Sequence, residues 1–346
     1  MRLPVTAGQW RGMRRSTLAW LCALLLAAAA GSAAGALRVA VISDLNGSYG
    51  STRYEPAVRE AVEGIVALKP DLVLSTGDMV AGQRLHPPLE AAQVEAMWKA
   101  FHATVTEPIR DAGIPLAVTP GNHDASEYPG FRSERERYGA EWQARRPALH
   151  FVDASRYPFD YAFGLQDVLF VSLDVTRVGA LHPEQRQWLD AVLAEHAPRY
   201  RHRVVFSHLP VHPFTQGRET EVSADLELER LLAHHGVELY LSGHHHAFYP
   251  GYHAGIRYVS QACLGAGARR LIGAAQRAER AVTWLEFDDE GVRIEARTGK
   301  GLAGRIDLEA LPRAIRTTRA TLLRDDLRPP TPATPGARVP SGSGES

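Results

Sequence analysis

The sequence predicts an α/β fold, in which short buried strands alternate with amphipathic helices. Residues 37–43 form an apolar run rich in β-branched side chains, as do residues 71–75, and both runs are typical of buried strands. Between them, residues 54–68 carry apolar side chains at helical spacing and stop before Pro70. Strands that alternate with helices in this way indicate an α/β architecture.

The same alternation continues along the chain. Helical spacing predicts further helices at 89–110, 182–195 and 225–235. Apolar runs predict further strands at 114–119, 203–207, 237–241 and 256–260. Two hairpins are expected, one formed by 159–165 and 167–173 with its turn at Gln166, the other by 282–287 and 291–296.

Residues 1–36 are predicted to be an export signal. Four arginines and no acidic residue precede or flank an apolar block from Leu18 to Ala30, and small residues follow, so cleavage is expected before Leu37. The alternative is an uncleaved anchor, because the weakly polar run 17–37 is about long enough to span a bilayer. The Ala-rich block favours cleavage, a periplasmic or secreted protein and no stable membrane span. The general secretory (Sec) route is favoured over the twin-arginine (Tat) route at which Arg14-Arg15 hints.

The charge of the chain argues against specific nucleic-acid binding. The formal net charge of all 346 residues is zero, and without the N-terminal arginines the remainder is mildly acidic. It has no stripe of Lys and Arg with interleaved aromatic residues. Cys263 is the one cysteine after the signal, so no internal disulfide is expected. Residues 328–346 are rich in Pro, Ser and Gly and are predicted to be a disordered tail, which leaves 37–327 as the folded domain.

Side chains that bind metals in proteins follow five of the predicted strands. The clusters are Asp44-Leu45-Asn46, Gly77-Asp78, Gly121-Asn122-His123-Asp124, His208 and Gly243-His244-His245-His246. Taken singly, an Asp after a strand is more often a turn or helix-cap residue, and a lone His is more often a packed one. In α/β sheets, however, ligand-binding groups gather beyond the carboxyl ends of the strands. Five such clusters with oxygen or imidazole donors therefore predict a metal site.

The order of these clusters resembles the pattern of the calcineurin-like metallophosphoesterase superfamily: Asp-x-His, Gly-Asp, Gly-Asn-His-Asp/Glu, His and Gly-His-x-His. The resemblance extends from Leu37 to about Phe287, and residues 159–189 are also similar to the purple-acid-phosphatase-like and cyclic-nucleotide-phosphodiesterase-like branch. It implies a four-layer αββα sandwich of two mixed β-sheets flanked by helices, with two metal ions at its rim.

The resemblance also implies a role for each matching residue. Asp78 would bridge both metals, Asp44, Asn46 and His246 would hold one of them, and Asn122, His208 and His244 the other. His123 would be the acid beside the leaving group, oriented by Asp124, and His245 would be a bystander or an outer-sphere group. Mixed oxygen and nitrogen donors suit Mn, Fe, Zn or Ni without choosing among them.

These roles imply an exported, binuclear-metal-dependent phosphoesterase that hydrolyses phosphate mono- or diesters, nucleotides included, by metal-bound hydroxide. The alternative is a non-catalytic metal- or phosphate-binding module that retains the fold. One residue departs from the superfamily pattern, because Asn46 stands where His is usual. Its amide oxygen is a weaker donor than imidazole, so weaker binding or a preference for a harder metal such as Mn is expected at that site. A one-metal or inactive protein is the third possibility.

Residues 125–158 are rich in Arg, Glu and aromatic residues without a clear period. They are interpreted either as an insertion over the open face of the site or as an ordinary surface excursion. Five arginines of this segment are candidates for steering an anionic substrate: Arg132, Arg135, Arg137, Arg145 and Arg146. The alternative is a solvated charged face in which they pair with Glu134 and Glu136.

Overall fold

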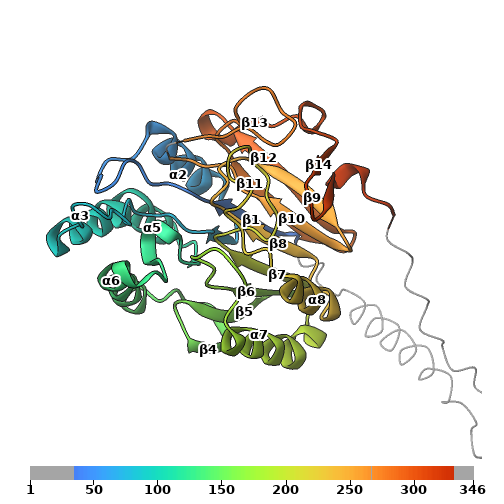
Figure 1. The fold of residues 1–346 in the computed structure, drawn as a ribbon, viewed down its shortest axis with the longest axis horizontal. Coiled ribbons are helices and arrows are strands. Elements are labelled where there is room, and N and C mark those ends of the chain that lie inside the picture. The colour runs from blue at the N-terminus through green and yellow to red at the C-terminus, as the bar shows by residue number, and fades with distance from the viewer. Residues whose placement is uncertain (1–34, 266, 331–346) are drawn as a thin grey trace, which may run out of the picture.

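The computed structural model describes residues 35–265 and 267–330, which form two mixed β-sheets with helices on their outer faces (Figure 1). Almost all of the predicted export signal and of the predicted disordered tail lies outside these residues. Within them, none of the helices has the length and the apolar content needed to cross a membrane. The architecture confirms the expected sandwich of two mixed sheets flanked by helices.

The first sheet has six described strands in the order β13-β12-β11-β1-β2-β3. Strands β1, β2 and β3 are parallel to one another, whereas β11 pairs antiparallel with β1, β12 with β11 and β13 with β12. The strand bounds are β1 Leu37–Ile42, β2 Leu72–Ser75, β3 Leu116–Val118, β11 Val282–Asp288, β12 Gly291–Thr298 and β13 Gly304–Arg305.

The second sheet has nine described strands in the order β14-β15-β9-β10-β8-β7-β6-β5-β4. The central strands β6, β7, β8 and β10 are parallel, and antiparallel strands complete both edges. The bounds are β4 His150–Arg156, β5 Asp160–Leu165, β6 Val168–Ser172, β7 His202–Ser207, β8 Leu239–Ser242, β9 Tyr249–His253, β10 Ile256–Ser260, β14 Ala314–Arg316 and β15 Thr321–Arg324.

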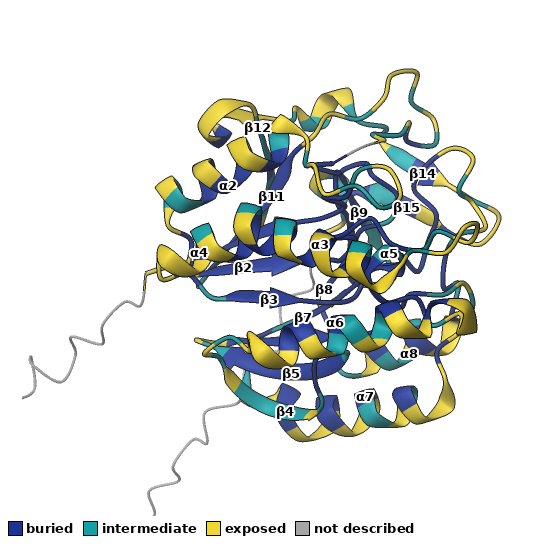
Figure 2. Cartoon of the chain, turned by 90° about the vertical axis from the view of Figure 1, so that its left-hand side faces the viewer, coloured by how far each residue is buried: buried dark blue, intermediate teal, exposed yellow. Residues whose placement is uncertain are grey.

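Two groups of helices cover the outer faces of the sheets (Figure 2). Helices α2 to α6 lie on the side of the first sheet, and α7 and α8 lie against the second. The bounds are α2 Pro56–Leu68, α3 Ala91–Phe101, α4 Glu107–Asp111, α5 Asn122–Ala125, α6 Arg132–Ala144, α7 Pro183–His196 and α8 Leu226–His234, and a π-helical turn, His102–Thr106, joins α3 to α4.

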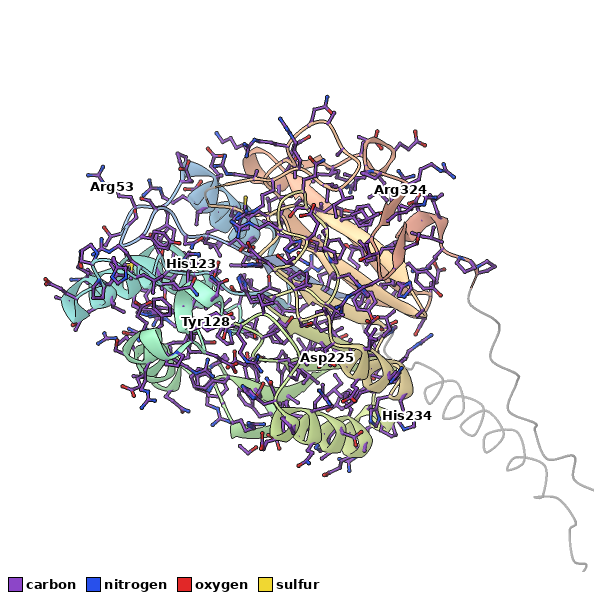
Figure 3. The ribbon with its side chains drawn as sticks, in the orientation of Figure 1. Arg53, His123, Tyr128, Asp225, His234 and Arg324 are labelled. Atoms are coloured by element: carbon purple, nitrogen blue, oxygen red, sulfur yellow. The ribbon has the colours of Figure 1, made fainter. Side chains whose placement is uncertain are left out.

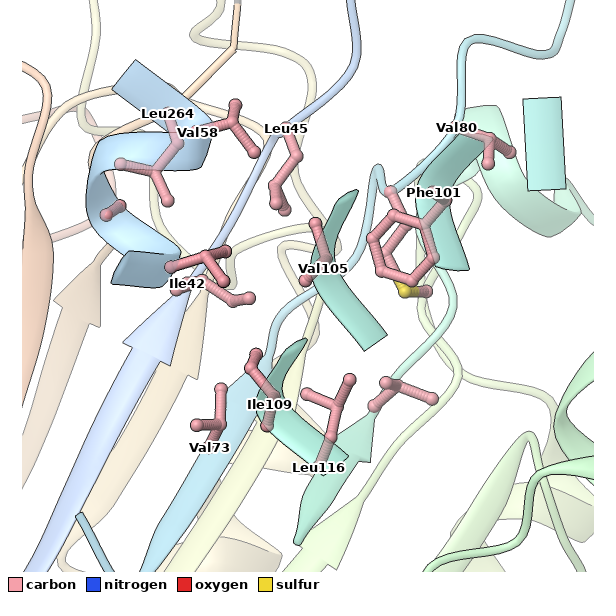
Figure 4. Packing of buried hydrophobic residues seen from close by; sticks show 14 of the residues in the cluster. Ile42, Leu45, Val58, Val73, Val80, Phe101, Val105, Ile109, Leu116 and Leu264 are labelled. Carbon is pink, nitrogen blue, oxygen red and sulfur yellow. The ribbon is translucent and has the colours of Figure 1, made fainter. Parts of the chain in front are cut away.

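The period of two along each strand divides its side chains between separate cores. Val39 and Val41 of β1 pack between the two sheets, in the same cluster as Phe206 of β7. Ala40 and Ile42 point the other way, into the cluster under the helices (Figure 4). Both faces of β1 are buried, which is why residues 39–42 are apolar without interruption.

The predicted segment 125–158 contains two elements that its sequence did not reveal, helix α6 and strand β4. Helix α6 buries Tyr138 and Trp142 against Trp98 of α3, with ring centroids 6.0 and 6.3 Å apart. The segment is therefore part of the packed domain on one side. Of the residues in this segment, Tyr128 alone is among those that line the pocket over the site.

Candidate metal centre

The parallel strands of both sheets end at one rim of the sandwich, and the predicted site residues lie there. Asp44 follows β1, Asp78 follows β2, Asn122 follows β3, and His208 and His244 follow β7 and β8. Backbone hydrogen bonds join these loops, since Asp44 N–H donates to the carbonyl of Gly77 at 3.0 Å and Leu45 N–H to that of Asp78 at 2.8 Å. Parallel neighbours therefore bring together residues that are far apart in the sequence.

Two groups of metal-binding side chains share the carboxylate of Asp78. Asp78, His208 and His244 each present one donor atom, and the three atoms lie within 4.8 Å of one another. Asp44, Asp78 and His246 form a second group within the same limit. A shared carboxylate is the arrangement that the family resemblance implies for a ligand that bridges two metals.

Asn122 joins the first of these groups through its amide oxygen. Asn122 Oδ1 lies 2.9 Å from His208 Nε2, while its Nδ2 donates to Gln83 Oε1 at 2.6 Å and so sets the amide orientation. The other ring nitrogen of His208 donates to the carbonyl of Thr76 at 2.8 Å, which points Nε2 into the site. An outer hydrogen bond that fixes the imidazole is typical of metal-binding histidines.

The charges of the site fit bound cations. Burial by itself would raise the pKa of Asp78 and Asp44, but His208 next to Asp78 and His246 next to Asp44 lower both. Conversely, burial would lower the pKa of the two histidines, yet Asp78 raises that of His208 to about 9 and Asp44 raises that of His246 to about 10. The protons on these imidazoles compensate two buried carboxylates. Metal cations would replace them in that role, so the donor set fits the predicted ions.

The backbone of the site is held in a demanding conformation. Asp44, Asp78, His244 and His246 have φ values of 51°, 56°, 64° and 53°, in the left-handed region that non-glycine residues rarely adopt. The glycines of the motifs allow close approach between loops, because a Cβ on Gly121 would collide with Asp78 and a Cβ on Gly243 with Ser43 and Asp44. Strain of this kind persists where the surrounding structure enforces it for function.

His123 lies at the edge of the site with its ring already oriented. Its Nε2 is 3.9 Å from Asp78 Oδ2, and its Nδ1 is 2.9 Å from the carbonyl oxygen of Gly82. Because a carbonyl only accepts, Nδ1 carries the proton of that hydrogen bond and Nε2 faces the pocket. Tyr49 approaches the same ring, with centroids 5.3 Å apart.

The predicted orientation of His123 by Asp124 is wrong. Both oxygens of the buried Asp124 carboxylate are occupied by backbone N–H groups, of Met79 and Val80 at 2.8 and 2.9 Å and of Gly121 at 2.9 Å. Burial and the charge of Asp78 raise the pKa of Asp124 to about 7 against these hydrogen bonds. Asp124 thus ties together the loops that carry Asp78 and Asn122, and Gly82 orients His123.

Asn46 lies in the same loop as Asp44 and is nearly buried. Its backbone N–H donates to the carbonyl of Asp78 at 3.2 Å, and within the described residues its side chain has no hydrogen bond. The ligand role of Asn46 stays a prediction, because the described donor groups do not include its side chain.

His245 and Glu221 show how the triple-histidine turn is supported. His245 Nδ1 accepts from Phe214 N–H at 3.0 Å and its Nε2 donates to the carbonyl of Glu221 at 3.2 Å, so His245 is an anchor outside the ligand set. The Glu221 carboxylate lies 2.9 Å from His244 Nε2. Glu221 stands in a loop without strand or helix periodicity, so no pattern in the sequence predicts its place at the site.

The site opens into a pocket of about 250 Å³ that contains three arginines. Arg177 pairs with Glu127 at 2.9 Å and Arg218 pairs with Glu221. The Nε of Arg269 is buried without a hydrogen bond in the described part of the chain. Tyr49 and Tyr128 stand at the pocket with more than two-fifths of their surfaces exposed, and Figure 3 shows Tyr128 on the same side of the molecule as His123. Arg177, Arg218, Arg269, Tyr49 and Tyr128 lie outside the five sequence motifs.

The arginines of residues 125–158 serve mainly structural contacts. Arg137 and Arg145 both pair with Glu141 at 2.6 Å, and Arg146 stacks over Phe151 at 4.2 Å. Arg135 pairs with the buried Asp174. The expected pairing of these arginines with Glu134 and Glu136 is wrong. Arg137 and Arg145 pair with Glu141 instead, and Glu134 accepts a hydrogen bond from Gln83 N–H at 2.7 Å.

Comparison with solved structures shows the same fold in phosphatases and in one anchoring protein. The purple acid phosphatase PPD1 from yellow lupin (Lupinus luteus) seeds matches with a TM-score of 0.59 and 19% identity over 79% of this chain and 52% of its own. A dimetal phosphatase from Danio rerio matches with a TM-score of 0.52 and 17% identity, over 79% of this chain and 98% of its own. GAP50, the anchor in the inner membrane complex of Plasmodium, matches with a TM-score of 0.54 and 12% identity, over 79% of this chain and 88% of its own.

These identities support the fold alone, and this chain spans about half the length of the lupin protein. A search of curated proteins found no match. The model of the family described as calcineurin-like phosphoesterase, however, matches residues 37–248, which contain all five predicted clusters. The chain therefore belongs to the calcineurin-like phosphoesterase family.

Proposed function

We propose that this chain is an exported phosphatase with two metal ions, which hydrolyses phosphate monoesters of small molecules. The observation that carries the proposal is the carboxylate of Asp78, which belongs to both donor groups. A single carboxylate between two sets of ligands offers one oxygen to each of two ions and offsets their mutual repulsion. The N-terminal apolar block of the sequence supports export.

The residues present define which side chains would hold each ion. Asp44, Asn46, Asp78 and His246 would hold one, and Asp78, Asn122, His208 and His244 the other. When bound, a pair of divalent ions supplies Lewis acidity toward the phosphate oxygens and a water of lowered pKa. Asp44 and Asp78 are fully buried, so protein atoms rather than bulk water surround these negatively charged ligands.

The chain's own residues divide the remaining work. Arg269 lines the pocket and presents a fixed positive charge to the phosphate oxygens. His123 holds a proton near the leaving oxygen, because Gly82 fixes its Nδ1 and leaves Nε2 toward the pocket. The exposed rings of Tyr49 and Tyr128 offer a surface for the organic part of the ester.

A monoester fits this pocket better than a diester. A terminal phosphate carries nearly two negative charges at neutral pH. Of the three arginines that line the pocket of about 250 Å³, Arg177 and Arg218 are paired with carboxylates, whereas Arg269 has a buried Nε without a hydrogen bond in the described part of the chain. A diester carries one charge and needs room for a second organic group. The pocket charge thus favours the more highly charged and more compact group.

A comparison of two chromogenic substrates tests the substrate class. Protein from Leu37 onward, supplied with Mn, Fe or Zn, is expected to hydrolyse nitrophenyl phosphate with a higher kcat/KM than bis(nitrophenyl) phosphate. A higher kcat/KM for the diester would overturn the monoester assignment. Absence of turnover of either ester in protein that retains two metals would identify the non-catalytic binding module instead. Export is tested separately. The protein recovered from the periplasm or the medium is expected to have the mass of a chain that begins at Leu37.

Replacing Arg269 tests the phosphate-binding role. In Arg269→Gln the KM for nitrophenyl phosphate and the inhibition constant of inorganic phosphate are expected to rise about 10- to 100-fold, which corresponds to one charge-assisted hydrogen bond. Arg270→Gln is the matched control, because the neighbouring Arg270 is exposed and does not line the pocket. Equal constants in both variants would remove Arg269 from the binding site.

Replacing Asn46 tests its place in the ligand set. Asn46→His is expected to tighten binding of the first metal about tenfold or more, since imidazole is the stronger donor and even outer partners of a ligand change affinity by about 10–100-fold. Asn46→Ala is expected to weaken it. Metal titration of chelator-treated protein measures both. Affinity and metal preference that are the same in all three proteins would show that residue 46 is not a ligand.

A further inference from the structure

A third cluster of metal-binding side chains lies outside the metal centre. It consists of His212, in the segment between β7 and α8, Glu229 on α8 and His253 at the end of β9. One donor atom from each residue lies within 4.8 Å of the others. None of the three belongs to the five motifs of the metal centre. Figure 3 shows α8, between Asp225 and His234, well apart from His123.

His212 is buried with a donor atom that lacks a partner. Its side chain is only 4% exposed, and its Nε2 makes no hydrogen bond within the described residues. That nitrogen nevertheless lies 3.0 Å from Glu229 Oε2, close in distance but off the direction that a hydrogen bond requires. Buried polar atoms are nearly always satisfied, so this atom calls for an explanation.

A shared metal ion explains the off-axis approach. Two ligands of one tetrahedral zinc ion, at bond lengths of about 2.0–2.1 Å, are roughly 3.3 Å apart and point at the ion rather than at each other. The 3.0 Å separation of His212 Nε2 and Glu229 Oε2 is close to that value. The pair is therefore arranged as two ligands would be.

The third residue is oriented for the same role. His253 Nδ1 donates to the carbonyl of Thr321 at 3.2 Å, which leaves its Nε2 as an acceptor for a metal. Two aromatic rings pack against His212. The ring of Tyr258 lies edge-on to it with centroids 4.7 Å apart, and the centroid of the His253 ring lies 5.4 Å from that of His212.

We propose that His212, Glu229 and His253 bind a zinc ion, at a third metal site separate from the dinuclear centre. Two histidines and one glutamate form the donor set of zinc sites with three protein ligands and one open position. The Glu229 side chain is 15% exposed and His253 is half-buried, so solvent reaches the open position. The ion ties α8 and β9 to the segment 208–225, which also carries His208 and Glu221.

Zinc stoichiometry in a set of variants tests this site. Chelator-treated protein is loaded with Zn²⁺, freed of unbound metal and analysed by plasma mass spectrometry and calorimetry. The single variant Asp78→Asn is expected to retain one zinc ion. The double variant Asp78→Asn/His253→Ala is expected to lose that ion. His253→Ala alone is expected to bind one zinc fewer than the wild type and to keep kcat within about twofold, since His253 lies outside the metal centre.

Two further variants keep the result unambiguous. Glu229→Gln preserves the shape of the side chain and is expected to weaken the third zinc by more than the roughly 10–100-fold that outer partners contribute. His234→Ala is the matched control, an exposed histidine at the end of the same helix, and is expected to bind as much zinc as the wild type. Equal zinc content and affinity in the wild type, His253→Ala and Glu229→Gln would overturn the proposal. So would a loss of zinc in His234→Ala as large as in His253→Ala.

Discussion

Replacing Asp78 by asparagine is expected to empty both metal positions and to lower kcat/KM by about 10³-fold or more. The carboxylate belongs to both donor groups, and asparagine offers one neutral oxygen in place of two charged ones. Metal ions contribute several kcal/mol to the transition state, and each 1.4 kcal/mol corresponds to about a tenfold change in rate. Plasma mass spectrometry of the gel-filtered protein, beside turnover of nitrophenyl phosphate, measures the two effects in one preparation.

A carboxylate in the same sheet region provides the control for this variant. Asp71 precedes β2 and accepts a hydrogen bond from Arg38 N–H at 2.8 Å, but it is more than a third exposed and lies outside both donor groups. Asp71→Asn is therefore expected to retain metals and activity. Asp78→Asn protein with two metals at the dinuclear centre would contradict the bridging role.

Replacing His123 by alanine is expected to slow turnover while leaving the metals in place. His123 belongs to neither donor group, and a positioned general acid contributes about 10²–10⁴-fold. The loss should depend on the leaving group, because nitrophenolate departs without a proton whereas an alkoxide needs one. The measurement is kcat for nitrophenyl phosphate and for an alkyl phosphate in the wild type and in His123→Ala. Equal losses with both esters would exclude proton donation by His123.

Asp124→Asn distinguishes the proposed proton donor, His123, from the residue that holds the neighbouring loop in place, Asp124. Asparagine has one carbonyl oxygen for the three N–H groups that Asp124 accepts, so the loop carrying Asp78 should loosen. Weaker metal binding and a lower Tm are expected, without the dependence on leaving group that marks His123. A leaving-group dependence equal to that of His123→Ala would restore Asp124 as the residue that orients His123.

The sequence predicted best what depends on short, regular patterns. Buried strands such as 37–42 are apolar apart from Arg38, and the motif residues follow them directly, so Asp44, Asp78 and His208 could be placed at strand ends. Helix α6 escaped prediction because Tyr138 and Trp142 are its two large buried residues among charged neighbours. Strand β9 contains Pro250 and Gly251, which disfavour a strand in any reading from sequence.

Contacts that depend on how loops fold could not be predicted. The family resemblance assigns Asp124 to the orientation of His123, but the helical turn of α5 directs its carboxylate to backbone N–H groups of the loop after β2. Arg269 and Glu221 reach the pocket from loops without periodicity. His212, Glu229 and His253 come from three separate elements, and the fold alone brings them together.

The central claim is that two metal ions share Asp78 in a catalytically active protein. A crystal structure of protein loaded with Mn or Zn, with anomalous scattering recorded at the metal edge, tests it most directly when the same preparation is assayed for turnover. The expected result is two anomalous peaks about 3.5–4 Å apart, one beside Asp44 and His246 and the other beside His208 and His244, with the Asp78 carboxylate between them and hydrolysis of nitrophenyl phosphate. One peak or none at this rim of the sandwich, in protein that does or does not turn over, would contradict the claim.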